Sequence, residues 1–244
     1  MKIRRKNISF LIILIGLMVI FAFTQNTNQK EPKILSYKID LKKQEIEFYL
    51  KNENNKNIKT FKVLKEWLKT KNKTLIFAMN GGMFKKDFSP QGLYIENGIL
   101  KNKIDTLQNG YGNFYMQPNG IFYITNDKQG KIATTKKFKN QNVKFATQSG
   151  PMLLINGQIH NQFMKGSSNL NIRNGVGILP DGKIIFAMSK EKINFFDFAT
   201  YFKKLGCMNA LYLDGFVSKT YLPSKGYNKL NGNFGVIIGE VKDK

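Results

Sequence analysis

The sequence predicts an α+β fold, a mostly antiparallel β-sheet system with two principal helices in a single domain. Short apolar or alternating segments recur along the chain, and Asn-Gly or Asp-Gly pairs stand between several of them. Only two stretches show helical spacing of apolar residues after the N-terminal region. We find no internal repeat and no domain-scale break after residue 34, so these elements are expected to share one fold.

The first half of this pattern predicts two strands, a helix and a further strand. Residues 34–40 and 45–50 predict strands around a Lys-rich turn. Thr60 is expected to cap a helix that runs to about Lys71 and has Phe61, Leu64 and Leu68 on one face. The apolar run 75–79 predicts a buried strand that ends at Asn80.

The second half predicts hairpins, a second helix and two last strands. Tight hairpin turns are expected at Asn97-Gly98, Asn119-Gly120, Asn156-Gly157 and Asp181-Gly182. Asn194 is expected to cap a helix that runs to Leu205 and stops at Gly206. Residues 211–213 and 234–238 predict the last apolar strands.

The N-terminus has the order of a secretory signal. Lys2, Arg4, Arg5 and Lys6 precede an unbroken apolar run, 10–23, which is short for a spanning helix of roughly 17–25 residues. We therefore predict a signal peptide or N-terminal membrane anchor over 1–25, a polar linker over 26–33, and the folded domain over 34–241. The expected location is extracytoplasmic, in the periplasm or cell envelope, with inner-membrane attachment if the segment is uncleaved.

Composition narrows the classes of function. The chain has 39 basic and 16 acidic residues, a net charge of +23. Its lysines are scattered and no nucleic-acid motif is present, which disfavours nucleic-acid binding and instead suits anionic polymers or lipid head groups. His160 and Cys207 are the only residues of their kinds, so multi-His zinc sites and internal disulfides are excluded. No metal site and no cofactor are predicted.

Arg173 is the only arginine after the N-terminal basic region. Because lysine supplies nearly all the other positive charge, a retained guanidinium indicates a need for a planar, bidentate donor. A phosphate or carboxylate ligand would meet that need. The alternative is a structural arginine paired with a buried carboxylate.

Polar, glycine-containing segments adjoin the predicted strands in an ordered series. The relevant segments are 78–84 (AMNGGMF), 89–93 (SPQGL), 112–115 (GNFY), 148–153 (QSGPML), 173–177 (RNGVG) and 209–215 (NALYLDG). Taken together they resemble the phosphodiester glycosidase domain family, most closely its bacterial exported branch. The resemblance covers roughly 34–240. One departure is that Phe216 and Val217 precede Ser218, where animal members look like Asp-Gly-Gly-Gly-Ser.

The resemblance implies hydrolysis of a sugar-1-phosphodiester, so a phosphorylated carbohydrate or glycoconjugate is the expected partner. We hypothesise that Arg173 and backbone N–H groups near Gly81, Gly82 and Gly150 hold the phosphate. Asp214 would act as base or nucleophile, or would instead only accept turn N–H groups or pair with Arg173. Asn80 and Ser149 would fix substrate oxygens.

Further substrate-binding candidates complete this prediction. They are Gln91, Gln148, Asn174, Gly215 and Ser218, with His160 as a secondary candidate. The enzyme hypothesis requires the loops to converge on one pocket, with Arg173 and Asp214 within a substrate's width of each other. The competing hypothesis is a non-catalytic, envelope-tethered binding module for anionic glycans, which the net charge favours.

Overall fold

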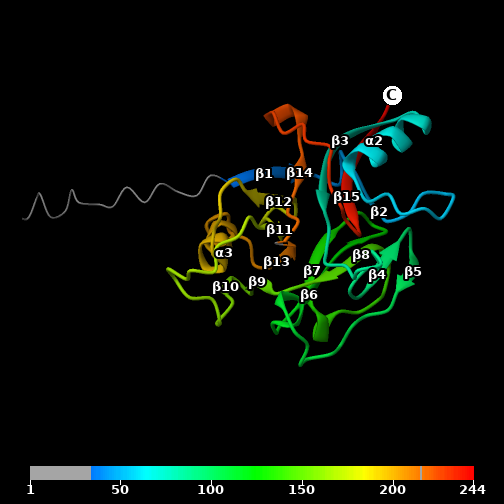
Figure 1. Cartoon of the computed structure of the whole chain (residues 1–244). Coiled ribbons are helices and arrows are strands. Elements are labelled where there is room, and N and C mark those ends of the chain that lie inside the picture. Colours follow the sequence, from blue (N-terminus) through cyan, green and yellow to red (C-terminus); the bar gives the residue numbers. More distant parts are fainter. Residues whose placement is uncertain (1–33, 215) are drawn as a thin grey trace, which may run out of the picture. The chain divides into compact units, whose positions relative to one another are not determined.

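The computed structural model describes residues 34–214 and 216–244 (Figure 1). The predicted signal or anchor (1–25), the linker (26–33) and Gly215 lie outside the described residues. Within them, no helix is both long and apolar enough to cross a membrane.

Antiparallel pairing joins the strands into three sheets, which confirms the predicted α+β class. The six-stranded sheet has the order β1-β12-β11-β13-β9-β10, the four-stranded sheet β14-β3-β15-β2, and the five-stranded sheet β5-β4-β8-β6-β7. The strands are β1 (Ile34–Ile39), β2 (Glu45–Tyr49), β3 (Lys73–Asn80), β4 (Tyr94–Glu96), β5 (Ile99–Asn102), β6 (Gly120–Thr125), β7 (Gly130–Thr134), β8 (Val143–Ser149), β9 (Met152–Ile155), β10 (Gln158–Ile159), β11 (Asn174–Ile178), β12 (Ile184–Ser189), β13 (Ala210–Asp214), β14 (Thr220–Tyr221) and β15 (Ile237–Asp243).

Both predicted helices are present with their predicted caps. The Val63 N–H donates to Thr60 Oγ1 (3.0 Å) at the start of α2 (Phe61–Thr70), and the Asp197 N–H donates to Asn194 Oδ1 (2.8 Å) at the start of α3 (Phe195–Lys204). The apolar face of α2 packs on the four-stranded sheet, and that of α3 packs on the six-stranded sheet. Each buried Phe or Leu contributes roughly 1.5–3 kcal/mol, so packing fixes both helices.

Three of the four predicted hairpin turns are confirmed. Asn97-Gly98 joins β4 to β5, Asn156-Gly157 joins β9 to β10, and Asp181-Gly182 lies between β11 and β12. The prediction for Asn119-Gly120 is wrong, because Gly120 begins β6. A Cβ there would lie 2.3 Å from Met152 Sδ, so close packing explains this glycine. The last strand also begins later than predicted, at Ile237.

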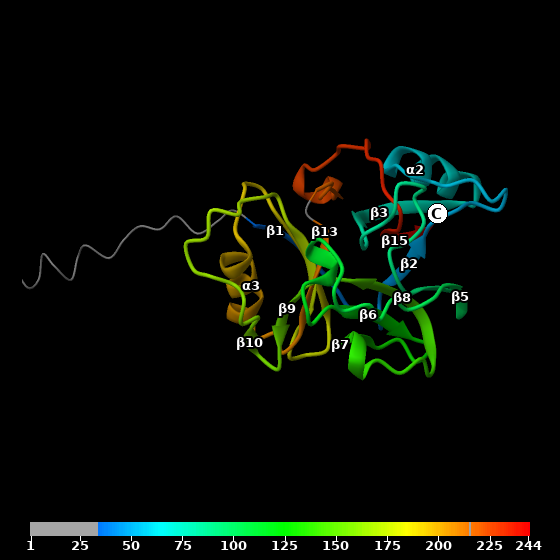
Figure 2. The ribbon, with the colours of Figure 1, turned by 60° about the horizontal axis from the view of Figure 1, so that its bottom comes forward.

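The sheets share one apolar core. Phe77 of the four-stranded sheet and Phe122 of the five-stranded sheet both pack on Phe186 of the six-stranded sheet, with ring centroids 5.3 and 5.7 Å apart. In Figure 2 the green strands β6 and β8 of the five-stranded sheet lie beside β2 of the four-stranded sheet. This packing brings the ends of β3, β8 and β13 and the start of β11 together.

Candidate functional site

Polar side chains meet where these strands end. Asn80 ends β3, Ser149 ends β8, Asn174 begins β11 and Asp214 ends β13, while Ser218 follows in the next loop. We call these residues the polar cluster. Asn80, Ser149, Asn174 and Asp214 are buried, and Ser218 is half-buried.

Asn174 connects the strands of the polar cluster. Its Nδ2 donates to the main-chain oxygen (2.9 Å) and to Oδ1 (3.0 Å) of Asn80. Its own Oδ1 accepts from the Asp214 N–H (2.8 Å) and the Ser218 hydroxyl (3.3 Å). Asn80 Oδ1 accepts a further bond from the Lys219 N–H (2.9 Å). One amide therefore fixes the positions of Asn80 and Asp214 relative to each other.

Asn80 retains an unused donor. Its Nδ2 is buried and has no hydrogen-bond partner among the described residues. An unmade hydrogen bond on a buried donor costs about 1–3 kcal/mol. Because Oδ1 is fully engaged, the side chain cannot rotate to satisfy Nδ2 without losing other bonds. Nδ2 is therefore a group of the polar cluster that has hydrogen-bonding capacity to spare.

Asp214 presents a carboxylate at the end of a buried strand. It is 6% exposed, and its Oδ1 accepts from the Phe216 N–H (3.0 Å). The Ser218 hydroxyl donates to the Asp214 main-chain oxygen. Burial raises the pKa of the nearby Tyr212 phenol, the Arg173 charge opposes that rise, and the Asp214 charge adds to it. A fixed carboxylate of this kind can accept a proton or attack an electrophilic carbon.

The glycines beside the cluster provide close packing. The Gly81 N–H donates to the Val236 oxygen (2.9 Å), so this N–H is not free for phosphate as the hypothesis required. Gly82 has φ +107°, and a Cβ there would lie 2.4 Å from Thr147 Oγ1. At Gly150 a Cβ would lie 2.7 Å from the Asn119 side chain. Any larger residue would displace the neighbouring chain.

Two side chains of β8 face the cluster. Ser149 Oγ donates to the Leu213 oxygen (2.8 Å), and Thr147 Oγ1 donates to the Gly81 oxygen (2.9 Å). Thr147 was absent from the predicted site residues. Side chains two positions apart lie on one face of a strand, so its spacing from Ser149 was the available signal.

Gln148 points to the opposite face of β8 and has a structural role. Its Oε1 accepts from the N–H groups of Leu93 and Asp105 (both 2.9 Å), and its Nε2 donates to the Asp105 oxygen (2.7 Å). Gln91 lies nearby, where its Nε2 donates to Tyr115 Oη (2.8 Å). Neither amide is joined to the polar cluster by these bonds.

Arg173 is separated from the polar cluster. It is 0% exposed, and its guanidinium lies over the Phe195 ring, 3.5 Å from the centroid. Nε donates to the Ile193 oxygen (2.8 Å), Nη1 to Tyr212 Oη (3.3 Å), and Nη2 to the main-chain oxygen and Oδ1 of Asn169 (2.9 and 3.1 Å). A phosphate cannot reach a guanidinium that is enclosed in this way. The predicted phosphate-clamp role therefore does not fit the structure.

His160 is also placed elsewhere. Its Nδ1 accepts from the Gln162 N–H (3.2 Å), and Nε2 lies 3.0 Å from the Gln117 oxygen, which requires the Nε2–H tautomer. Its ring stacks on Phe163. Burial lowers the pKa of His160, which favours the neutral ring. With both nitrogens bound to main chain, a substrate contact does not fit this position.

The chain is similar to known proteins in both sequence and fold. A family model described as phosphodiester glycosidase matches residues 73–236, more than half of the chain. The chain therefore belongs to the phosphodiester glycosidase family. The uncharacterised protein YigE of Escherichia coli K12 is 43% identical over 146 residues, which are 59% of this chain and 57% of YigE. The chain thus matches little more than half the length of that relative.

Solved structures share the fold. The catalytic domain of zebrafish N-acetylglucosamine-1-phosphodiester α-N-acetylglucosaminidase, auto-inhibited by its pro-peptide, has a TM-score of 0.57 and 15% identity over 88% of this chain and 85% of that chain. A Burkholderia pseudomallei protein described as exported has a TM-score of 0.56 and 9% identity over 85% and 73% of the two chains. At such identities the likeness establishes the fold alone.

Proposed function

We propose that this chain hydrolyses a sugar-1-phosphodiester at the polar cluster, releasing a sugar and a phosphomonoester. The observation that carries the proposal is that Asn174 holds both Asp214 and Asn80, and that Asn80 Nδ2 has no partner among the described residues. Membership of the phosphodiester glycosidase family supports this kind of reaction.

In the proposed reaction the bond between the anomeric carbon and the phosphate oxygen breaks, and its electron pair leaves with the phosphate. Asp214 removes a proton from an attacking water, or attacks the anomeric carbon itself to form an ester that water then hydrolyses. The phosphate departs as an anion. Less proton donation to the leaving oxygen is therefore needed than in an ordinary glycoside, where a second carboxylic acid usually supplies it.

Substrate positioning falls to groups other than Arg173. Asn80 Nδ2 would donate to a phosphate or sugar oxygen. Lys219, half-buried and bonded through its N–H to Asn80 Oδ1, would place positive charge beside the cluster. The Phe216 ring is 99% exposed only two residues after Asp214, and it suits packing against the apolar face of a sugar.

The test is sugar release by the purified protein from a panel of sugar-1-phosphodiesters. We expect Asp214→Asn to lower kcat/KM about 10²–10⁴-fold, because it removes the proposed base or nucleophile while keeping the side-chain shape. Asp181→Asn, at an exposed turn, is the matched control. Undiminished turnover by Asp214→Asn would remove this carboxylate from the reaction.

The net charge of +23 favours one alternative, a non-catalytic module that binds anionic glycans. Binding of a phosphorylated glycan without sugar release from any member of the panel would support that alternative.

We further propose that the protein acts outside the cytoplasm. The basic-then-apolar N-terminus supports export, as does the fold shared with a protein described as exported. Cell fractionation that finds the mature protein in the cytoplasm would contradict this.

A further inference from the structure

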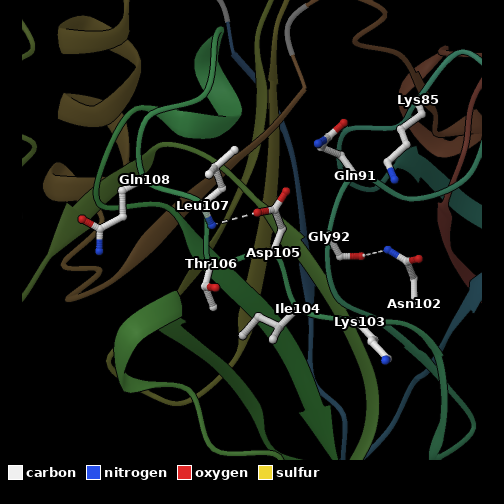
Figure 3. A pocket seen from close by; sticks show the side chains of 10 residues that line it. All are labelled: Lys85, Gln91, Gly92, Asn102, Lys103, Ile104, Asp105, Thr106, Leu107 and Gln108. Atoms are coloured by element: carbon white, nitrogen blue, oxygen red, sulfur yellow. Dashed lines mark hydrogen bonds between the residues drawn. The ribbon is translucent and has the colours of Figure 1, made fainter.

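A polar hollow of 690 Å³ lies between the segment 85–92 and the segment 102–108 (Figure 3). In Figure 3 Lys85, Gln91, Gly92, Asn102 and Lys103 lie on one side of it, and Thr106, Leu107 and Gln108 lie on the other. Figure 3 shows Lys85 and Gln91 on one wall, with the Asp105 carboxylate facing Gln91 across the hollow. The function proposed above does not use these groups.

Hydrogen bonds within the protein fix both walls of the hollow. Asn102 Nδ2 donates to the oxygens of Pro90 (3.1 Å) and Gly92 (2.7 Å). The Tyr115 hydroxyl donates to Asp105 Oδ2 (2.9 Å) and accepts from Gln91 Nε2 (2.8 Å). Gln91, Asn102 and Asp105 are therefore held in place before a ligand arrives, which reduces the entropy that these side chains lose on binding.

The hollow adjoins the polar cluster along the chain and through β8. The Gln91 N–H donates to the oxygen of Met83 (2.9 Å), the residue directly after Gly82. The Gln148 amide makes two hydrogen bonds to the main chain of Asp105, and these join the segment 102–108 to β8. Because Gln148 lies on the face of β8 opposite Thr147 and Ser149, a substrate that reached both places would pass the end of β8 at Ser149.

The available groups favour a ligand rich in acceptor oxygens. Lys85 and Lys103 bring ammonium groups to the rim, and Gln91, Thr106 and Gln108 bring neutral donors. The carboxylate of Asp105 already accepts from the Leu107 N–H and the Tyr115 hydroxyl. Two lysines against one aspartate give the lining a net positive charge, which suits phosphoryl oxygens.

We propose that this hollow is a second subsite, which binds the part of a phosphorylated glycan that lies outside the bond being cleaved. The inference deepens the proposed function and rests on it for the identity of the reaction. Lys85 and Gln91 are its specificity-determining residues.

Two substrates that share one sugar-1-phosphate test the subsite. The short substrate carries a methyl group on the phosphate, and the long one carries a phosphorylated oligosaccharide. We expect Lys85→Ala to raise KM for the long substrate about tenfold, as expected for loss of a charge-assisted contact, and to leave the short substrate unchanged. Lys86→Ala is the matched control, since Lys86 is equally exposed but does not line the hollow. Equal effects of Lys85→Ala on both substrates, or none on either, would overturn the subsite.

Direct binding separates this inference from the proposed reaction. Calorimetry with the phosphorylated oligosaccharide alone needs no turnover. Weaker binding by Lys85→Ala and Gln91→Leu, but not by Lys86→Ala, would support the subsite even if the wild-type protein hydrolyses neither substrate. Equal affinity of all these proteins would overturn it, whatever the outcome for hydrolysis.

Discussion

The two faces of β11 at its first residues have opposite characters. Asn174 points toward β3 and bonds to Asn80, whereas the preceding residue, Arg173, points toward α3 and lies against Phe195 and Tyr212. Consecutive side chains on a strand point to opposite faces. A sequence motif that contains both residues therefore divides between the candidate site and the protein interior.

The comparison shows that a buried charge need not mark a site. The partners that the structure gives the Arg173 guanidinium are uncharged: main-chain and amide oxygens, a phenol and an aromatic face. Burial lowers the pKa of Arg173, although the Tyr212 phenol opposes this. Arg173 thus joins the segment around Asn169 to α3 and β13, and the polar cluster depends on this packing indirectly.

Replacing Arg173 should destabilise the packing around α3, because its guanidinium lies against Phe195 and Tyr212. We expect Arg173→Met to lower the free energy of unfolding by about 3 kcal/mol or more, because several buried acceptors lose their donor. Arg173→Lys should also destabilise, since an ammonium cannot reproduce the planar fork. Denaturant unfolding measures both, with the exposed Lys203→Met on α3 as control. Full stability combined with loss of sugar release would instead restore the phosphate-clamp hypothesis.

Asn80→Asp tests the polar cluster. The substitution keeps an acceptor for Asn174 Nδ2 and the Lys219 N–H but replaces the unpartnered Nδ2 donor with an oxygen. We expect kcat/KM to fall roughly 10–100-fold, which corresponds to the loss of one charge-assisted hydrogen bond. The thermal midpoint should fall as well, because the new carboxylate is buried near Asp214, so activity is compared at a temperature at which both proteins are folded. A stable variant with full activity would show that Nδ2 does not contact substrate.

We expect a small dependence of stability on pH that comes from His160, which belongs to an aromatic layer near Arg173. His160 stacks on Phe163, Phe163 stacks on Phe195, and Phe195 lies under the guanidinium. Because burial lowers the pKa of His160, the unfolded chain binds its proton more readily than the folded one. The stability from this residue is complete above the unfolded pKa of about 6.5 and is lost as pH falls below it.

Unfolding measured between about pH 7 and about pH 5 tests this sign. The slope of the free energy of unfolding against pH should decrease in His160→Gln. Sugar release should be retained, because His160 lies outside the polar cluster. An unchanged slope would show that His160 keeps its ordinary pKa in the folded protein.

Most of the fold could be predicted because local rules dominate it. Thr60 and Asn194 cap the two helices as expected, and three of the Asn-Gly or Asp-Gly turns lie between strands that pair. The turn predicted at Asn119-Gly120 is wrong because this glycine is needed for close packing against Met152, which is distant in sequence. Turn propensity carries no information about such a neighbour.

The candidate site could be predicted only in part. Asn80, Ser149, Asn174, Asp214 and Ser218 come together, since each stands at or near a strand end. The sequence could not show to which side Arg173, just before β11, or Gln148, within β8, would point, because neighbouring positions differ only by the register of pairing. Arg173 and His160 drew attention because each is rare in the sequence. Both are bound by residues distant in the chain, such as Ile193 for Arg173 and Gln117 for His160, and the sequence did not predict these contacts.

Gln148 has a consequence for how this protein can diverge from its relatives. Its amide forms hydrogen bonds with main-chain atoms of Leu93 and Asp105 and with the Thr135 hydroxyl. Because the bonds to Asp105 involve main-chain atoms, they do not depend on the side chains of the segment 102–108. Substitutions on the exposed part of that segment can therefore accumulate while the anchoring bonds persist. Such substitutions would change the lining of the proposed subsite without altering the polar cluster.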